Sequence, residues 1–74
     1  MSVLREINGK KVLVQPESEQ DGHRFYRVTM GTRGPWPADH ELIALCEPGA
    51  HGRVCRIGSS KTWRMVVIQR EAQS

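Results

Sequence analysis

Four side chains that could bind a metal ion lie close together in the sequence: His40, Cys46, His51 and Cys55. Structural zinc sites usually bring their ligands together as two tight pairs, such as two cysteines separated by roughly two to four residues. Histidine and cysteine alternate here, and that paired pattern is missing from the sequence. We therefore expect two reduced core thiols, two surface imidazoles and no bound metal.

Covalent catalysis needs a base within hydrogen-bond reach of a nucleophile, and a third group that orients the base. Both cysteines near His51 lie in apolar stretches, which indicates buried and inert thiols. Ser59 and Ser60 lack the flanking glycines of a nucleophile elbow. Ser60 also stands where a phosphate-binding loop needs a glycine before its lysine, and the pattern that follows predicts a strand instead of a helix. The sequence therefore predicts no enzymatic activity and no cofactor.

Arginine and tryptophan are the side chains best suited to bind a macromolecule. Residues 51–74 carry five Lys/Arg against one Glu, whereas residues 1–50 have a net charge of −1. Tryptophan and arginine are enriched at binding hot spots, and Trp36 stands between two prolines that limit the entropy it would lose on docking. The predicted binding residues are Arg33, Trp36, Arg53, Arg56, Lys61, Trp63, Arg64 and Arg70. The alternatives are a solvated strand face for the arginines and a Trp36 that folds back over the sheet edge.

A β-hairpin near the N-terminus is the clearest element that could position these side chains. The Asn-Gly pair at 8–9 favours a two-residue turn because both residues tolerate a positive φ. Strands over 3–7 and 10–15 follow from it, with Leu4 opposite Leu13. Residues 16–22 are polar and end in Asp-Gly, which predicts a loop.

A third strand is predicted over 23–30, where aromatic and β-branched residues are frequent. Tyr26, Val28 and Met30 share one face of it by alternation, and we expect that face to be buried. Residues 31–37 contain two glycines and two prolines, which predict a rigid, turning connection.

A short helix is predicted over 38–47. Leu42, Leu45 and Cys46 have helical spacing, acidic residues stand in the first turn, and Pro-Gly follows as a stop signal. A buried strand is the alternative, because periodicity cannot resolve so short an apolar run.

The last third predicts a second hairpin, with strands over 53–57 and 62–70 joined by the four residues 58–61. That loop length predicts Arg56 opposite Trp63, and Val54 opposite Met65. The run 65–68 is apolar on both faces, so its strand should be central in the sheet or covered on both sides.

The order strand, strand, strand, helix, strand, strand (β-β-β-α-β-β) predicts an α+β domain in which one short helix packs on a small antiparallel sheet. An all-β, partly open small barrel is the alternative. We expect residues 1–74 to form a single domain whose tail, 71–74, frays. No apolar run approaches the roughly 18 residues that cross a bilayer, and the N-terminus becomes charged too early for a signal peptide. These features predict a cytoplasmic protein with no membrane partner.

By elimination, the expected function is stoichiometric occupation of a larger protein or nucleoprotein complex. Small inhibitors and regulators encoded by phages and mobile elements, including anti-CRISPR and anti-restriction proteins, share this size and plain chemistry. The likeness is one of type and not of sequence. The alternative is a small basic module that binds RNA or single-stranded DNA with a sheet face. A structural subunit that completes a larger sheet or oligomer is a third class.

Overall fold

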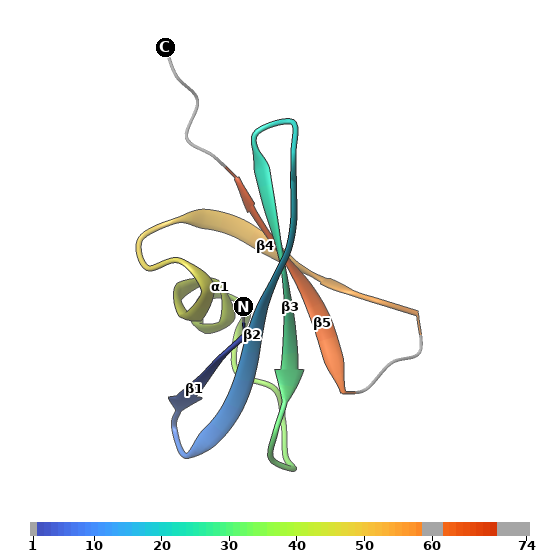
Figure 1. The fold of residues 1–74 in the computed structure, drawn as a ribbon. Coiled ribbons are helices and arrows are strands. Elements are labelled where there is room, and N and C mark those ends of the chain that lie inside the picture. The colour runs from blue at the N-terminus through green and yellow to red at the C-terminus, as the bar shows by residue number, and fades with distance from the viewer. Residues whose placement is uncertain (1, 59–61, 70–74) are drawn as a thin grey trace.

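The computed structural model describes residues 2–58 and 62–69. Five strands and one helix follow in the predicted order: β1 (Val3–Ile7), β2 (Lys10–Gln20), β3 (His23–Met30), α1 (Asp39–Cys46), β4 (His51–Arg56) and β5 (Trp63–Gln69). The strands form one antiparallel sheet in the order β1-β2-β3-β5-β4 (Figure 1). This confirms the α+β prediction. The alternative of an all-β, partly open small barrel is wrong, because the sheet is open and is not closed into a barrel.

The first hairpin forms as its sequence predicts. Asn8 and Gly9 have φ values of 51° and 77°, as a type I′ turn requires. Leu4 is the partner of Leu13 in the resulting register. Strand β5 lies between β3 and β4, so the prediction that it is central is also confirmed.

The predicted loop over 16–22 is wrong, because β2 continues to Gln20. The register shifts between Pro16 and Ser18, so one extra residue is accommodated as a bulge. The turn is confined to Asp21 and Gly22, whose φ values are 52° and 78°. A bulge lets a proline stand within a paired strand. Residues 16–20 form a strand because they pair with β3, and their polar composition does not indicate this pairing.

The predicted register of the second hairpin is wrong by one residue. Arg56 is the partner of Arg64 and not of Trp63, and Val54 is the partner of Val66 and not of Met65. A slip of one residue moves every side chain of a strand to the opposite face of the sheet. The register is therefore determined by which side chains must be buried. The observed pairing places the most deeply buried residues of β5 beneath α1. Most of the predicted turn, 59–61, lies outside the described residues.

Helix α1 forms where predicted, so the strand alternative for this segment is wrong. Its first turn is capped by its own acid, since the backbone N–H of Ala38 donates to Glu41 Oε1 at 2.9 Å. The preceding Pro37 is buried, which fixes the entry to the helix. At the other end, the backbone N–H of Glu47 donates to the carbonyl oxygen of Ile43 at 2.9 Å.

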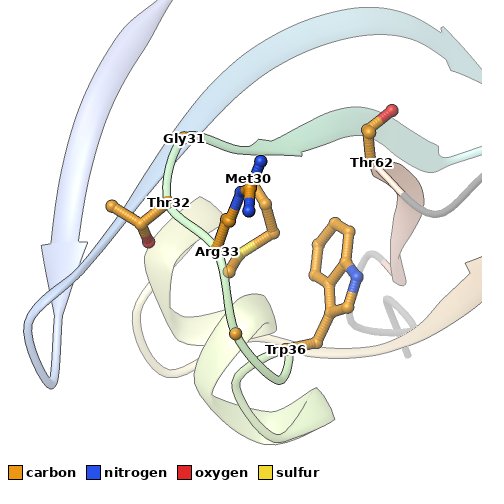
Figure 2. Close-up of a pocket in the computed structure, with 7 residues that line it drawn as sticks. Met30, Gly31, Thr32, Arg33, Trp36 and Thr62 are labelled. Carbon is orange, nitrogen blue, oxygen red and sulfur yellow. The ribbon is translucent and has the colours of Figure 1, made fainter.

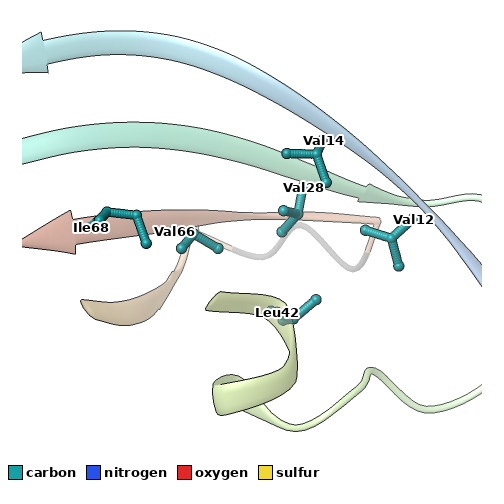
Figure 3. Packing of buried hydrophobic residues seen from close by; sticks show 6 residues of the cluster. All are labelled: Val12, Val14, Val28, Leu42, Val66 and Ile68. Carbon is teal, nitrogen blue, oxygen red and sulfur yellow. The ribbon is translucent and has the colours of Figure 1, made fainter. Parts of the chain in front are cut away.

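The core lies between α1 and one face of the sheet. Leu42 points from the helix toward valines from three strands, as Figure 3 shows. The buried cluster consists of Val12, Val14, Val28, Leu42, Val66 and Ile68. We call this side of the sheet the covered face. Tyr26 and Met30 pack against the same cluster, which confirms the face predicted to be buried in β3.

The opposite side of the sheet is called the open face, because α1 and Trp36 both pack against the covered face. Alternation and register assign its residues from each strand. They include Leu4, Leu13, Phe25, Arg27, Arg53, Cys55, Trp63, Met65 and Val67. Among the residues that the structure describes, no helix is long and apolar enough to span a membrane.

Candidate functional site

The structure divides the predicted binding residues between two regions. Trp36, Arg56 and Arg64 gather at one end of the covered face, and Arg33 lies in the connection beside them. Arg53 and Trp63 belong to the open face. Lys61 and Arg70 lie outside the described residues. The sequence therefore identified individual side chains, but their division between two surfaces follows from the register of β4 and β5.

Trp36 returns to the sheet and does not project outward from its proline-rich connection. It is half-buried and packs against the core cluster. The guanidinium carbon of Arg64 lies 4.4 Å from the centroid of the indole. This cation–π contact, of the kind worth about 0.5–2 kcal/mol, fixes both side chains. Arg56 stands directly opposite Arg64, and like charges in that position repel each other.

A hollow of about 330 Å³ opens beside Trp36. Met30 and Arg33 lie across it from the indole, and Thr62 stands at its rim, as Figure 2 shows. The backbone closes the same corner, because the N–H of Met30 donates to the carbonyl of Thr62 at 2.9 Å. We call this feature the Trp36 hollow.

The open face is a continuous surface across the middle of the sheet. Leu13, Thr29 and Trp63 form one row of strand partners. The next two rows consist of Gln15, Arg27, Met65 and Cys55, and of Ser18, Phe25, Val67 and Arg53. Apolar side chains thus occupy the centre of this face, and two arginines lie among them.

Arg27 and Trp63 form the best-defined contact on the open face. The guanidinium carbon of Arg27 lies 4.0 Å from the indole centroid. Its Nε also lies 3.4 Å from Glu17 Oε1, which places an acid beside the stacked pair. That Nε is buried and has no hydrogen-bond partner among the described residues. Arg27 therefore lies between the ring of Trp63 and the carboxylate of Glu17.

Val67 shows how closely the open face is packed. It is only 7% exposed, although it does not belong to the core cluster beneath α1. Neighbours on its own face bury it, since Phe25 and Arg53 are its strand partners. Phe25, Trp63 and Met65 are each half-buried. The side chains at the centre of the open face therefore pack against one another.

Sequence reasoning missed Arg27, Phe25 and Met65 as parts of a surface. The available signal was the two-sided apolar run of β5, which predicts cover on both faces of a central strand. Only one of those faces is covered by an element of the described chain. The missing cover identifies the open face.

A second polar cluster joins the end of α1 to β3, and its role is structural. Arg24 donates two hydrogen bonds to the Glu47 carboxylate, at 2.5 and 2.8 Å, and the Tyr26 hydroxyl donates a third at 2.5 Å. The Arg24 hydrogen bond is the main cause that lowers the pKa of Glu47. Burial, reinforced by Glu47, raises the pKa of Tyr26 to about 12. Every charged group of this cluster is satisfied internally.

The two cysteines are free and differ in their surroundings. Burial raises the pKa of the Cys46 thiol to about 12, with the Glu47 charge as a smaller cause. Cys46 therefore stays a neutral thiol near pH 7, whereas Cys55 lies on the open face beside Met65. Within the described ranges, no group of three His, Cys, Asp or Glu side chains is arranged to bind a metal ion.

No family model matches this chain, and no curated protein or solved structure is significantly similar to it. The candidate functional regions are therefore its two surfaces, the open face and the Trp36 hollow.

Proposed function

We propose that this protein is a non-enzymatic binding module that occupies the surface of a larger protein with its open face. The observation that carries the proposal is the apolar centre of that face, where no helix or strand of the described chain packs over Trp63, Met65 and Val67 of a central strand. Apolar residues on both faces are typical of strands that are covered twice. The partner supplies the second cover.

The composition of the open face supports a protein partner. Interface cores are enriched in aromatic residues, Met and Arg, and are depleted in Lys and Glu. Phe25, Trp63 and Met65 provide the apolar anchors, and Arg27 and Arg53 add charge beside them. Because Arg27 is already stacked on Trp63, this pair loses little conformational entropy on docking.

The same geometry favours protein over nucleic acid on this surface. Single-stranded nucleic acids bind sheet faces through bases stacked on exposed aromatic rings and phosphates on basic side chains. Arg27 already lies over the ring of Trp63, and Glu17 lies beside that arginine. Leu4 and Leu13 add aliphatic side chains, which offer no stacking surface. An apolar protein patch with acidic residues at its rim fits better.

The biological class is a finer part of the same proposal. A stoichiometric inhibitor or regulator in the cytoplasm, of the anti-CRISPR or anti-restriction type found in phages and mobile elements, needs only a small rigid surface. The apolar open face with its arginines supports this class by analogy of type. The arginines of the face would meet acidic residues of the target and mainly raise the association rate.

Two arginines of β4 provide a matched test of the surface. Arg53 lies on the open face and Arg56 on the covered side, and both are exposed. Affinity capture from nuclease-treated lysate of the source cells should retain a stoichiometric protein partner with wild type and with Arg56→Glu. Capture with Arg53→Glu, and with Met65→Ser, should lose it. Equal retention by all four proteins, each shown to be folded, would contradict the assignment of the open face.

Cys55 allows the same surface to be mapped in the complex. Its thiol lies on the open face, whereas the raised pKa of Cys46 keeps that second thiol unreactive near pH 7. Alkylation of Cys55 should slow when the captured partner is bound. An unchanged rate would mean that the partner binds elsewhere, and loss of the captured material on nuclease treatment would mean that the partner is nucleic acid.

A further inference from the structure

Strand β4 forms one edge of the sheet, and one side of its backbone has no strand beside it. It is the last strand in the order β1-β2-β3-β5-β4, and within the described residues it pairs with β5 alone. An edge strand presents backbone N–H and C=O groups that can pair with another chain. The proposed function does not use these groups, because it rests on side chains of the open face.

The register decides which backbone groups of β5 point toward β4. Opposite residues of an antiparallel pair alternate between hydrogen-bonded pairs, whose N–H and C=O groups point toward each other, and pairs that make no such bonds. The N–H of Met30 donates to the carbonyl of Thr62, in line with the register of β3 on β5. Thr62 and every second residue after it on β5 therefore direct their backbone toward β3. Met65 and Val67 direct theirs toward β4.

The same alternation continues into β4. The partners of Met65 and Val67 on this strand are Cys55 and Arg53. Their backbone groups point inward, toward β5. The groups of the alternate residues point out of the sheet, and these residues are Gly52, Val54 and Arg56. The outer edge of β4 therefore presents a row of N–H and C=O groups at the spacing of a strand.

The opposite edge of the sheet is protected against a further strand. β1 pairs with β2 as far as Val14, and beyond that point β2 contains Pro16, a bulge and Glu17. Proline, bulges and charged side chains are the devices by which edge strands avoid pairing with other chains. β4 contains no proline and keeps a regular register from His51 to Arg56. Its arginines leave the edge open to a strand of opposite charge.

We propose that the outer edge of β4 binds an extended acidic segment of a partner protein, which joins the sheet as an added strand. In this mode of recognition, main-chain hydrogen bonds provide the affinity and side chains provide the specificity. The inference goes beyond the proposed function and does not depend on it, because the backbone edge makes the contact instead of the open face.

The charge of β4 favours an acidic segment. Arg53 and Arg56 are exposed, and neither forms an ion pair within the described chain. No acidic residue stands in β4. Opposite charges on neighbouring strands attract each other, and like charges repel. A second copy of β4 would bring the same arginines to the junction from both sides without an acid to balance them, so the edge disfavours pairing with itself.

The positions of the two arginines set the spacing of the acids. Arg53 and Arg56 are three residues apart, so their side chains leave opposite faces of the strand. A segment with acids three residues apart can place one acid beside each arginine. A segment with acids two residues apart directs both to one face, and it reaches one arginine.

A synthetic peptide tests the edge without knowledge of the natural partner. The probe is a threonine- and valine-rich peptide of about eight residues, an ordinary strand length, with two glutamates three residues apart. Amide hydrogen exchange of the isotope-labelled protein is the readout. Without peptide, the inward N–H groups of Arg53 and Cys55 should exchange slowly and those of the outward residues rapidly. With peptide at about ten times its Kd, exchange at Gly52, Val54 and Arg56 should slow about tenfold by mass action.

Slowing of alternate amides is specific to an added strand. Equal slowing along the whole of β4, or slowing confined to other strands, would place the peptide elsewhere and overturn the proposal. No change at about 2 mM peptide, beyond the usual range of weak specific binding, would overturn it as well.

Two further peptides test the charge and its spacing. Lysines in place of both glutamates should weaken binding about tenfold or more, because attraction to each arginine becomes repulsion. Glutamates two residues apart should weaken it about threefold, because one arginine is left without an acid. If either peptide bound as well as the first, the arginines would not recognise the segment and the proposal would be wrong.

Two exposed arginines make a matched control on the protein. Arg56→Gln should weaken binding of the first peptide about threefold, since one favourable cross-strand pair is lost. Arg33→Gln removes the same charge away from the edge and should leave the affinity unchanged. Equal loss in both variants would show attraction to net charge only, and it would overturn the proposal.

Val54→Pro tests the role of the backbone. It removes an outward N–H without a hydrogen bond to β5, and a proline in this position is tolerated by an edge strand. Val54→Ala also shortens the side chain but keeps the N–H. Val54→Pro should therefore lose the peptide and Val54→Ala should retain it, and equal binding would contradict strand addition. If Val54→Pro does not fold, the alternation of exchange in wild type decides.

Met65→Ser separates this inference from the proposed function. The change should prevent capture of a protein by the open face and leave the affinity for the peptide as in wild type. Loss of the peptide by folded Met65→Ser would place it on the open face and overturn the assignment of the edge. Failure of the peptide to bind wild type leaves the open face untouched, since capture of a protein partner tests that surface.

Discussion

Both faces of this sheet carry apolar residues, but the two faces differ in how far these residues are buried. On the covered face, Leu42 closes a cluster of aliphatic side chains that are almost completely buried. On the open face, Trp63, Phe25 and Met65 remain half-buried, and arginines lie among them. The covered face stabilises the fold, and we propose that the open face keeps its apolar surface for a partner.

The comparison shows why β5 is the most informative strand. Its side chains alternate between Val66 and Ile68 on the covered face and Met65 and Val67 on the open face. In an antiparallel sheet that packs against the core on one face only, one of these two sets would be polar. Retaining both sets leaves apolar side chains at the surface on one side of the sheet, and this is the physical basis of the binding that we propose.

The largest effect is expected for Leu42→Ala, which removes the side chain that α1 inserts into the core. Leu42 is 0% exposed. The lost burial and the cavity that remains should cost about 2–5 kcal/mol of unfolding free energy. This is a large share of the stability of a small domain. Urea denaturation followed by circular dichroism measures it. A loss below about 1 kcal/mol would mean that α1 does not close the core.

Gly52→Ala tests how closely β4 approaches β5. A Cβ at Gly52 would collide with the backbone carbonyl oxygen of Val67, which cannot move aside as a side-chain tip could. The edge strand would have to shift, at a cost of about 1–3 kcal/mol typical of overpacking. Gly31→Ala is the control, because its nearest contact is a looser 3.3 Å to the Lys11 carbonyl oxygen. The same denaturation curves should show a smaller loss for Gly31→Ala, and the reverse order would contradict the observed register.

The sequence predicted what depends on local signals. The Asn-Gly turn fixed the first hairpin and its register, and the acids and the Pro-Gly stop located α1. The extension of β2 through Pro16 was missed, because a bulge becomes stable only when β3 is paired beside it. The register of β4 on β5 was missed because it depends on which residues α1 buries, and tertiary packing decides that.

The candidate surfaces were predicted less completely than the fold. Trp36, Trp63 and the arginines were recognised from their types, but not their partners across the sheet. Arg27 was missed because nothing in the sequence indicates that it stacks on Trp63. Glu47 joins α1 to Arg24 and Tyr26, and no local pattern in the sequence indicates these contacts. Side-chain contacts between elements that are distant in the sequence depend on the topology of the fold. Local sequence patterns carry no information about that topology.

Glu47→Gln should destabilise the protein in a pH-dependent way. The pKa of Glu47 is held below its ordinary value of 4.5, chiefly by the Arg24 hydrogen bond. A lowered pKa stabilises the fold above the ordinary value, and the contribution is lost as the pH falls through the lowered one. Wild type should therefore be more stable than Glu47→Gln near pH 7, and the two should converge in acid. Thermal unfolding from pH 7 to pH 2 measures the difference.

A matched variant at Tyr26 checks that the pH effect belongs to Glu47. Tyr26→Phe removes one hydrogen bond to the carboxylate and should cost about 1 kcal/mol. It leaves Arg24 in place, so its stability should still fall in acid as that of wild type does. A difference between wild type and Glu47→Gln that stays constant down to pH 2 would contradict the role of the charged carboxylate.

The smallest effect on stability is expected for Leu4→Ala, which makes the same chemical deletion as Leu42→Ala on the other side of the sheet. Leu4 is 60% exposed on the edge strand β1, so little buried area is lost, and the change should stay within about 0.5 kcal/mol. Its effect should appear in binding instead, as weaker retention of the protein partner by the open face. If Leu4→Ala destabilised the isolated protein as much as Leu42→Ala does, both faces would stabilise the fold. The proposal that the open face is kept for binding would then be wrong.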